Sequence, residues 1–106
     1  MSFIGSSKCV KSSLVNIYFS DTFSDHQKFA VITPKRIGNT VIRNKCRRWL
    51  KETIVRNIHQ IRKEYSIIMI ATHQLTKSNF KSCHDMVLLK LKKRQLIYEN
   101  INNRIN

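Results

Sequence analysis

Three short segments rich in β-branched and aromatic residues predict strands. Residues 14–20 and residues 28–33 form the first two. The polar segment 21–27 between them predicts a turn, and so short a connection favours an antiparallel hairpin. Residues 65–71 are apolar nearly throughout, which is typical of a central strand buried on both faces. Residues 5–13 are mostly small and polar and predict a loop.

Apolar residues recur at helical spacing in two longer segments. Gly38 and Asn39 predict a turn, and Asn39 or Thr40 can cap a helix. Helical spacing continues to about Glu64, with a boundary between two helical stretches near Asn57. Residues 79–96 predict a second helix. The apolar side of the first helix comprises Ile42, Cys46, Trp49, Leu50, Thr53 and Asn57, continued by Ile54, Ile58 and Ile61; that of the second comprises Phe80, Cys83, Val87, Leu88, Leu91 and Gln95. The order β-β-α-β-α predicts a single α+β domain over residues 1–106.

The charge of the chain is strongly positive and unevenly distributed. Twenty Lys and Arg residues face six Asp and Glu residues, which gives a net charge of +14. Residues 34–64 carry ten basic and two acidic side chains, hence +8, whereas residues 1–33 carry +1 and residues 65–106 carry +5. Because such a concentration of charge repels itself within the fold, it indicates a polyanionic partner, and nucleic acid is the commonest one.

The first predicted helix places its cations on the side opposite the apolar residues. At 100° per residue, Asn44, Arg48 and Lys51 fall on that side and Arg47 lies beside them. Arginine can bind a phosphate through two parallel hydrogen bonds, and the Asn44 amide can both donate and accept. The spacing therefore predicts a phosphate-binding helix face, although a helix-surface asparagine without a binding role also fits Asn44.

The first predicted strand offers a second candidate contact. Asn16 and Tyr18 point to one face of it, while Val15, Ile17 and Phe19 point to the other face, which we expect to meet the core. Tyr18 can then stack on an unpaired base, as aromatic residues do in proteins that bind single strands. A half-buried structural tyrosine fits the same pattern, and the sequence leaves the two readings open.

The remaining chemistry-bearing residues argue against catalysis and metal binding by the chain. Its cysteines and histidines lack the spacing of a zinc site, and Cys46 and Cys83 fall on apolar helix faces. Six scattered carboxylates do not suit a two-metal nuclease, and two glycines do not make a phosphate loop. The sequence also shows neither a membrane-spanning run nor a secretory signal, so we expect a cytoplasmic location.

One ordered motif resembles a known family. Two basic residues, an aliphatic residue, Gly-Asn, three small or aliphatic residues, a basic-Asn-basic triplet and further spaced cations follow one another. This order resembles the signature of the protein subunit of bacterial ribonuclease P, and weaker similarity extends over residues 10–95. The matching residues are Lys35, Arg36, Ile37, Gly38, Asn39, Thr40, Val41, Ile42, Arg43, Asn44, Lys45, Arg47, Arg48 and Lys51.

The resemblance implies an accessory role in tRNA maturation. In that family an RNA subunit with bound magnesium removes the 5′ leader of precursor tRNA, and the protein binds both the RNA subunit and the leader. Magnesium is then held mainly by RNA, and the protein alone has neither catalytic residues nor a metal site. The implied RNA-binding residues are Lys35, Arg36, Asn39, Arg43, Asn44, Lys45, Arg47, Arg48 and Lys51, with Asn16 and Tyr18 in the leader cleft. The implied fold is a small α/β sandwich with a left-handed βαβ crossover, which departs from the usual right-handed rule.

The chain departs from the family pattern in three places. The family begins with a basic helix that also lines the cleft, and this sequence is expected to start after it. Lys45 replaces the second arginine of the triplet, which keeps the charge without the bidentate geometry, and Thr72 stands where arginine is common. Residues 100–106 are expected to fray.

Three other interpretations stay open at this point. A general basic RNA-binding or ribosomal structural protein would bind folded RNA without affecting cleavage. A stand-alone nuclease would cut without an RNA subunit. A decayed or mis-started copy would account for the absent first helix. The sequence says nothing about the oligomeric state.

Overall fold

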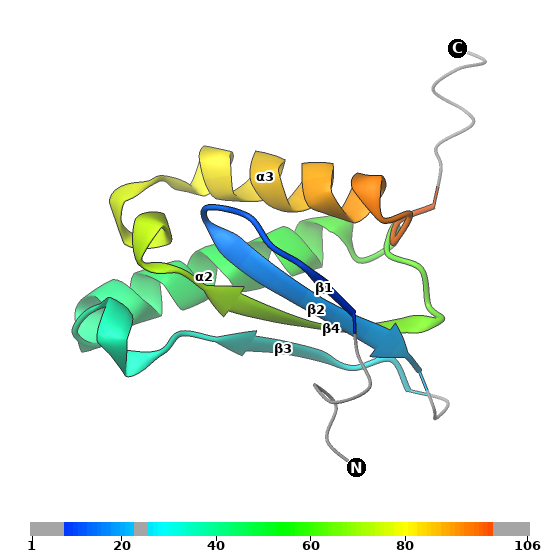
Figure 1. Cartoon of the computed structure of the whole chain (residues 1–106), viewed down its shortest axis with the longest axis horizontal. Coiled ribbons are helices and arrows are strands. Elements are labelled where there is room, and N and C mark those ends of the chain that lie inside the picture. The colour runs from blue at the N-terminus through cyan, green and yellow to red at the C-terminus, as the bar shows by residue number, and fades with distance from the viewer. Residues whose placement is uncertain (1–7, 23–25, 99–106) are drawn as a thin grey trace.

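The computed structural model describes residues 8–22 and 26–98 and combines one sheet with two long helices (Figure 1). Expectations about the family's N-terminal helix and about residues 100–106 concern positions outside these ranges. The elements are β1 (Lys8–Val10), β2 (Val15–Asp21), β3 (Phe29–Ile32), the 3-10 helix η1 (Lys35–Ile37), α2 (Thr40–Asn57), β4 (Tyr65–Ala71), the 3-10 helix η2 (His73–Lys77) and α3 (Phe80–Lys93).

The four strands lie in the order β1-β2-β4-β3. Strand β4 is central as predicted, antiparallel to β2 and parallel to β3. The predicted hairpin of β2 with β3 is therefore wrong, because β4 lies between them. Parallel strands need a crossover connection, and α2 supplies it between β3 and β4. The left-handed sense of this crossover stays a prediction.

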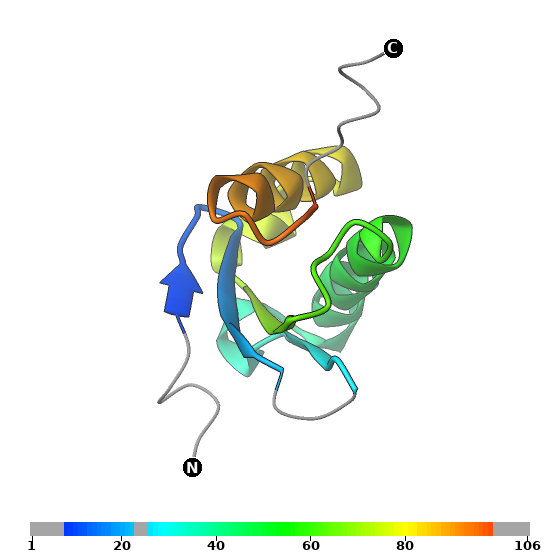
Figure 2. The same ribbon diagram turned by 90° about the vertical axis from the view of Figure 1, so that its right-hand side faces the viewer.

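Both long helices cover the same face of the sheet. Figure 2 shows α2 and α3 together on one side of the strands, and none of the described helices covers the opposite face. Burying apolar side chains between these two layers is the main stabilising contribution to such a fold. The core comprises Val15, Ile17 and Phe19 of β2, Ile67, Met69 and Ala71 of β4, Cys46, Leu50 and Ile54 of α2, and Cys83, Val87 and Leu91 of α3, with further residues from the connections.

Helix α2 is shorter than its apolar spacing predicts, because it ends at Asn57 rather than near Glu64. The buried Asn57 side chain donates to the Thr53 carbonyl, and its own carbonyl oxygen accepts from the Gln60 side chain. Ile61 leaves the helix and forms an antiparallel bridge with Ile97. The apolar spacing that looked like a longer helix thus serves a turn, in which Ile61 is buried and Ile58 is 38% exposed.

Helix α3 agrees with the prediction in its core positions but not at its end. Asn79 caps it through a side-chain bond from the Ser82 amide, and its predicted residues Cys83, Val87 and Leu91 are buried. The helix ends at Lys93, and Gln95 adopts a positive φ of 57°. This left-handed conformation turns the chain back, so that the Leu96 amide bonds to the Leu91 carbonyl and Gln95 is exposed.

A further strand precedes the predicted β-β-α-β-α order. Residues Lys8–Val10 form β1, antiparallel to β2, where a loop was expected. Three residues are too few to show the alternating pattern that identifies strands. None of the helices in the described part of the chain is long and apolar enough to cross a membrane.

Candidate nucleic-acid interface

The start of α2 is built by two residues of the motif. Of the two predicted caps, Asn39 and Thr40, Asn39 is the N-cap, and its side-chain oxygen accepts from the Ile42 amide at 3.0 Å. Gly38 lies so close to the first turn that a β-carbon there would be 2.9 Å from Cγ2 of Ile42. These two residues let the chain turn sharply from η1 into the helix, which places the following cations.

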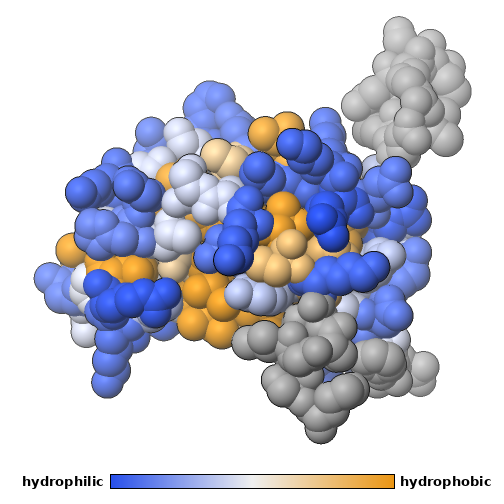
Figure 3. Space-filling model, viewed as in Figure 1, coloured by the Kyte–Doolittle hydropathy of each residue, from blue (hydrophilic) through white to orange (hydrophobic). Residues whose placement is uncertain are grey.

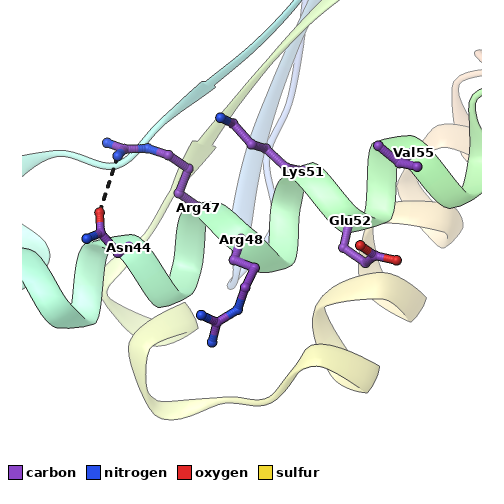
Figure 4. A pocket seen from close by; sticks show the side chains of 6 residues that line it. All are labelled: Asn44, Arg47, Arg48, Lys51, Glu52 and Val55. Carbon is purple, nitrogen blue, oxygen red and sulfur yellow. Dashed lines mark hydrogen bonds between the residues drawn. The ribbon is translucent and has the colours of Figure 1, made fainter.

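Six side chains of α2 line an open hollow of about 380 Å³ on its solvent side. Figure 4 shows them along the middle of the helix: Asn44, Arg47, Arg48, Lys51, Glu52 and Val55. The four residues that the sequence predicted for the solvent-facing side are thus brought together, with three cations and one amide. Their placement follows from helical geometry, since residues three and four apart share a face.

Arg47 is positioned by the end of β3. Its guanidinium donates from Nη2 to the Thr33 hydroxyl at 2.9 Å and from Nη1 to the Asn44 side-chain oxygen at 3.4 Å. Thr33 is buried, so the contact joins the hollow to the sheet. By contrast, Arg48 and Lys51 are exposed and make no hydrogen bond or ion pair with the described residues. Their charges are therefore available to a ligand.

Two other predicted cations contact the protein itself. Arg43 donates from Nε to the Thr33 carbonyl at 3.0 Å. Lys45 lies 3.5 Å from the Thr76 carbonyl in η2, with its ammonium 5.1 Å from the centre of the Trp49 ring. Both side chains are half-buried, so they join α2 to its neighbours as well as contributing charge. Lys35 and Arg36 are exposed on η1, beside the start of α2.

Sequence reasoning missed two residues that line the hollow. Glu52 forms an ion pair with Arg56 at 2.9 Å, and Val55 is 64% exposed. Arg56 also lies over the ring of Phe80, 4.8 Å from its centre. The four-residue spacing of Glu52 and Arg56 is a sequence signal that could have identified the pair. Glu52 thus brings a carboxylate to one end of the cationic face.

The helix-free face of the sheet carries the other predicted contacts. Asn16 and Tyr18 do point away from the core, as predicted, since they alternate with buried neighbours in β2. The strand register places Tyr18, Ile68 and Ala30 in one row and Asn16, Ile70 and Ile32 in the next. This open sheet face is partly apolar, with Ile32 40% exposed, and Figure 3 shows apolar surface across its middle. Asn16 and Tyr18 do not belong to the lining of the α2 hollow.

The tyrosine and cysteine environments limit their chemistry. A hydrogen bond with Cys9, its partner on strand β1, raises the pKa of Tyr18 above its ordinary value. Burial raises the pKa of Cys83 to about 11 and also raises that of Cys46. A thiol needs its thiolate form to act as a nucleophile, so these two residues serve the core. The described residues contain no group of three or more His, Cys, Asp or Glu side chains that could hold a metal.

Comparisons with known proteins agree with this arrangement. The Ribonuclease P family model matches residues 2–95. The ribonuclease P protein component of Syntrophomonas wolfei is 30% identical over 86 residues, which cover 81% of this chain and 72% of that protein. The protein component of a Clostridium botulinum strain is 30% identical over 77 residues, covering 73% of this chain and 62% of that protein.

A solved structure shows the same fold. The structure of a Staphylococcus aureus RNase P protein mutant superposes with a TM-score of 0.81 at 21% identity, over 91% of this chain and 80% of that one. This similarity confirms the α+β architecture. With a family match over most of its length, the chain belongs to the Ribonuclease P family.

Proposed function

We propose that the chain is the protein component of ribonuclease P and assists removal of the 5′ leader from precursor tRNA. The observation that carries the proposal is the cationic hollow of α2, in a chain whose residues 2–95 match the family. Cleavage belongs to the RNA subunit with its magnesium, which is held mainly by RNA. The site of action is the cytoplasm, where precursor tRNA is processed.

The hollow binds the phosphates of a single-stranded leader, and the open sheet face binds its bases. Arg48 and Lys51 contact leader phosphates, while Thr33 and Asn44 hold Arg47 at the edge of the sheet. Unpaired bases stack on Tyr18 and on the apolar rows of the open sheet face. The phosphate contacts are independent of base identity, which suits a component that must accept leaders of many sequences.

The motif at the start of α2 contacts the RNA subunit. Lys35 and Arg36 are exposed on η1, which directly precedes α2, and Arg43 and Lys45 add charge in the first turns of α2. Asn39 acts indirectly here, because its side chain caps the helix. Neutralising phosphates on both RNAs lets a structured RNA and its substrate approach each other at low magnesium.

The direct test is cleavage of a 5′-extended precursor tRNA at low magnesium. Three reactions are compared: a bacterial ribonuclease P RNA alone, the protein alone, and the two together. We expect cleavage at the mature 5′ end in the mixture only. Cleavage by the protein alone would identify a stand-alone nuclease. RNA binding without any stimulation of cleavage would identify a general RNA-binding protein, and either result would overturn the proposal.

A further inference from the structure

A second group of cations gathers where α3 ends. Lys92, Lys93 and Arg94 are exposed in and just after the last turn of the helix. They are joined there by cations from two other parts of the chain, the loop before β4 and strand β1. We call this group the α3-end surface, and its residues are Lys8, Arg62, Lys63, Lys92, Lys93 and Arg94.

Specific contacts bring the three segments together. The Arg62 amide bonds to the Leu96 carbonyl at 2.8 Å, directly after the α3 turn. The Arg94 guanidinium lies 5.4 Å from the centre of the Phe19 ring. Lys8 is paired with Phe19 in the sheet register, and paired residues of antiparallel strands share a face. The convergence is therefore a product of the fold rather than of one charged run.

Acidic side chains neutralise little of the charge of these cations. Among the described residues, the Arg62–Glu64 pair at 3.5 Å is the one ion pair that involves the α3-end surface. Cations in a last helical turn are favoured by the helix dipole, which accounts for Lys92 and Lys93. The dipole acts within one turn, so it does not account for Lys8 or Lys63. A concentration of unpaired charge from three segments is the electrostatic footprint of a polyanion site.

The α3-end surface is separate from the hollow of α2. In Figure 1 the first half of α2 lies at the left of the molecule, whereas the C-terminal end of α3 lies at the right. The cations of the hollow come from residues 47–51, near the middle of α2, and those of the α3-end surface from segments that the motif does not include. One RNA strand bound along the hollow leaves this second surface free.

The side chains at this end favour phosphate contacts over base recognition. The aromatic rings here already face cations, since Arg62 lies 5.1 Å from the Tyr98 ring centre and Arg94 covers Phe19. Phe19 is buried in the core and Arg62 occupies one face of the Tyr98 ring, which leaves little aromatic surface here for an unpaired base to stack on. The other four cations of the α3-end surface are lysines, which bind phosphate as point charges rather than through the planar guanidinium of arginine. These features suit the backbone of double-helical RNA, which is recognised by shape and phosphate contacts.

We propose that the α3-end surface binds the sugar-phosphate backbone of folded, double-helical RNA while the hollow of α2 binds a single strand. This deepens the proposed function and rests on it for the identity of the RNA, because the RNA subunit supplies such helices. The two surfaces let one protein hold a helical part of one RNA and a flexible strand of another at the same time.

The test measures binding of the full chain to three probes at several salt concentrations. The probes are a bacterial ribonuclease P RNA, a single-stranded leader oligonucleotide, and vesicles containing anionic lipid. The variant K92Q/K93Q removes two charges from the α3-end surface. The control K11Q/K28Q removes two exposed charges elsewhere, which keeps the net charge of the two variants equal.

We expect K92Q/K93Q to bind the folded RNA at least about tenfold more weakly at moderate salt, with the slope of log K against log salt reduced by about 1.8. Its binding to the leader oligonucleotide and the behaviour of the control should change little. Equal losses in both variants, or unchanged binding of folded RNA, would overturn the proposal. A loss confined to the vesicles would assign the surface to lipid instead. Because this readout is binding, it stands apart from the cleavage assay, whose failure would bear on the proposed function.

Discussion

Arg47 and Arg48 are neighbours in the chain, yet the structure gives them different roles. Arg47 is held by Thr33 and Asn44, whereas Arg48 extends into solvent without a partner among the described residues. A phosphate that binds Arg47 must compete with the hydrogen bonds that its guanidinium already donates to Thr33 and Asn44. Arg48 and Lys51 lose less on binding, because only water is displaced from their charged groups. The exposed pair is therefore the place to test leader binding.

Neutralising Arg48 or Lys51 should weaken leader binding at every leader sequence. The variants R48Q and K51Q each remove one phosphate contact, so the slope of log K against log salt should fall by about 0.7 for a single strand. Fluorescence anisotropy with two leader oligonucleotides of different sequence measures this, with K28Q as the control for a lost surface charge. Unchanged affinity in both variants would exclude the hollow from leader binding, and a loss for only one sequence would indicate base recognition.

At the scale of the element, the start of α2 depends on a close approach of backbone to side chain. Gly38 has extended rather than left-handed backbone, so its φ does not require glycine. The requirement is steric, because a β-carbon at this position would lie 2.9 Å from Cγ2 and 3.1 Å from Cβ of Ile42. Gly38 thus allows the sharp turn into α2, the helix that carries the cations.

The variant G38A should destabilise the protein by about 1–3 kcal/mol through overpacking against Ile42. In the double variant G38A/I42A the 2.9 Å contact with Cγ2 is removed and the 3.1 Å contact with the β-carbon of residue 42 remains, so the combined cost should be smaller than the sum of the two single costs. Urea unfolding of the wild type, G38A, I42A and G38A/I42A measures the interaction energy between the two positions. Strictly additive costs would show that the contact between Gly38 and Ile42 does not limit this position.

At the scale of the whole molecule, charge repulsion works against the core. A net charge of +14 on 106 residues is accompanied by few ion pairs in the described ranges, and those are largely exposed. Exposed pairs stabilise little, so they do not offset the repulsion among the remaining cations. Binding of RNA would relieve this repulsion and stabilise the fold as well as forming the complex.

Added salt should therefore raise the melting temperature of the free protein. Between about 20 mM and about 200 mM NaCl the Debye length shortens enough to screen neighbouring cations, and we expect a rise of a few degrees. Circular dichroism melts measure it, and K92Q/K93Q should respond less because it carries less charge. A melting temperature that falls with salt would show that ion pairs outweigh repulsion.

The same molecular scale shows where sequence reasoning succeeded and where it did not. The core faces of both helices and the inward residues of β2 followed from spacing, because each period is a local property of the backbone. The end of α2 did not follow from spacing. Ile58 and Ile61 keep helical spacing, but Ile61 forms a β-bridge with Ile97 instead of continuing the helix. The hairpin prediction was wrong because a short connection between β2 and β3 does not exclude the insertion of β4, a strand later in the chain, between them.

The amino-acid sequence by itself determined the cationic face of α2, because side chains at helical spacing share a side wherever the helix is placed. It also determined the outward face of Tyr18 and narrowed the cap of α2 to Asn39 or Thr40, because both depend on a few neighbouring residues. The tertiary structure decided the rest. The contact of Arg47 with Thr33, the open sheet face and the α3-end surface join segments far apart in the chain, and only the packing of helices on one side of the sheet brings them together.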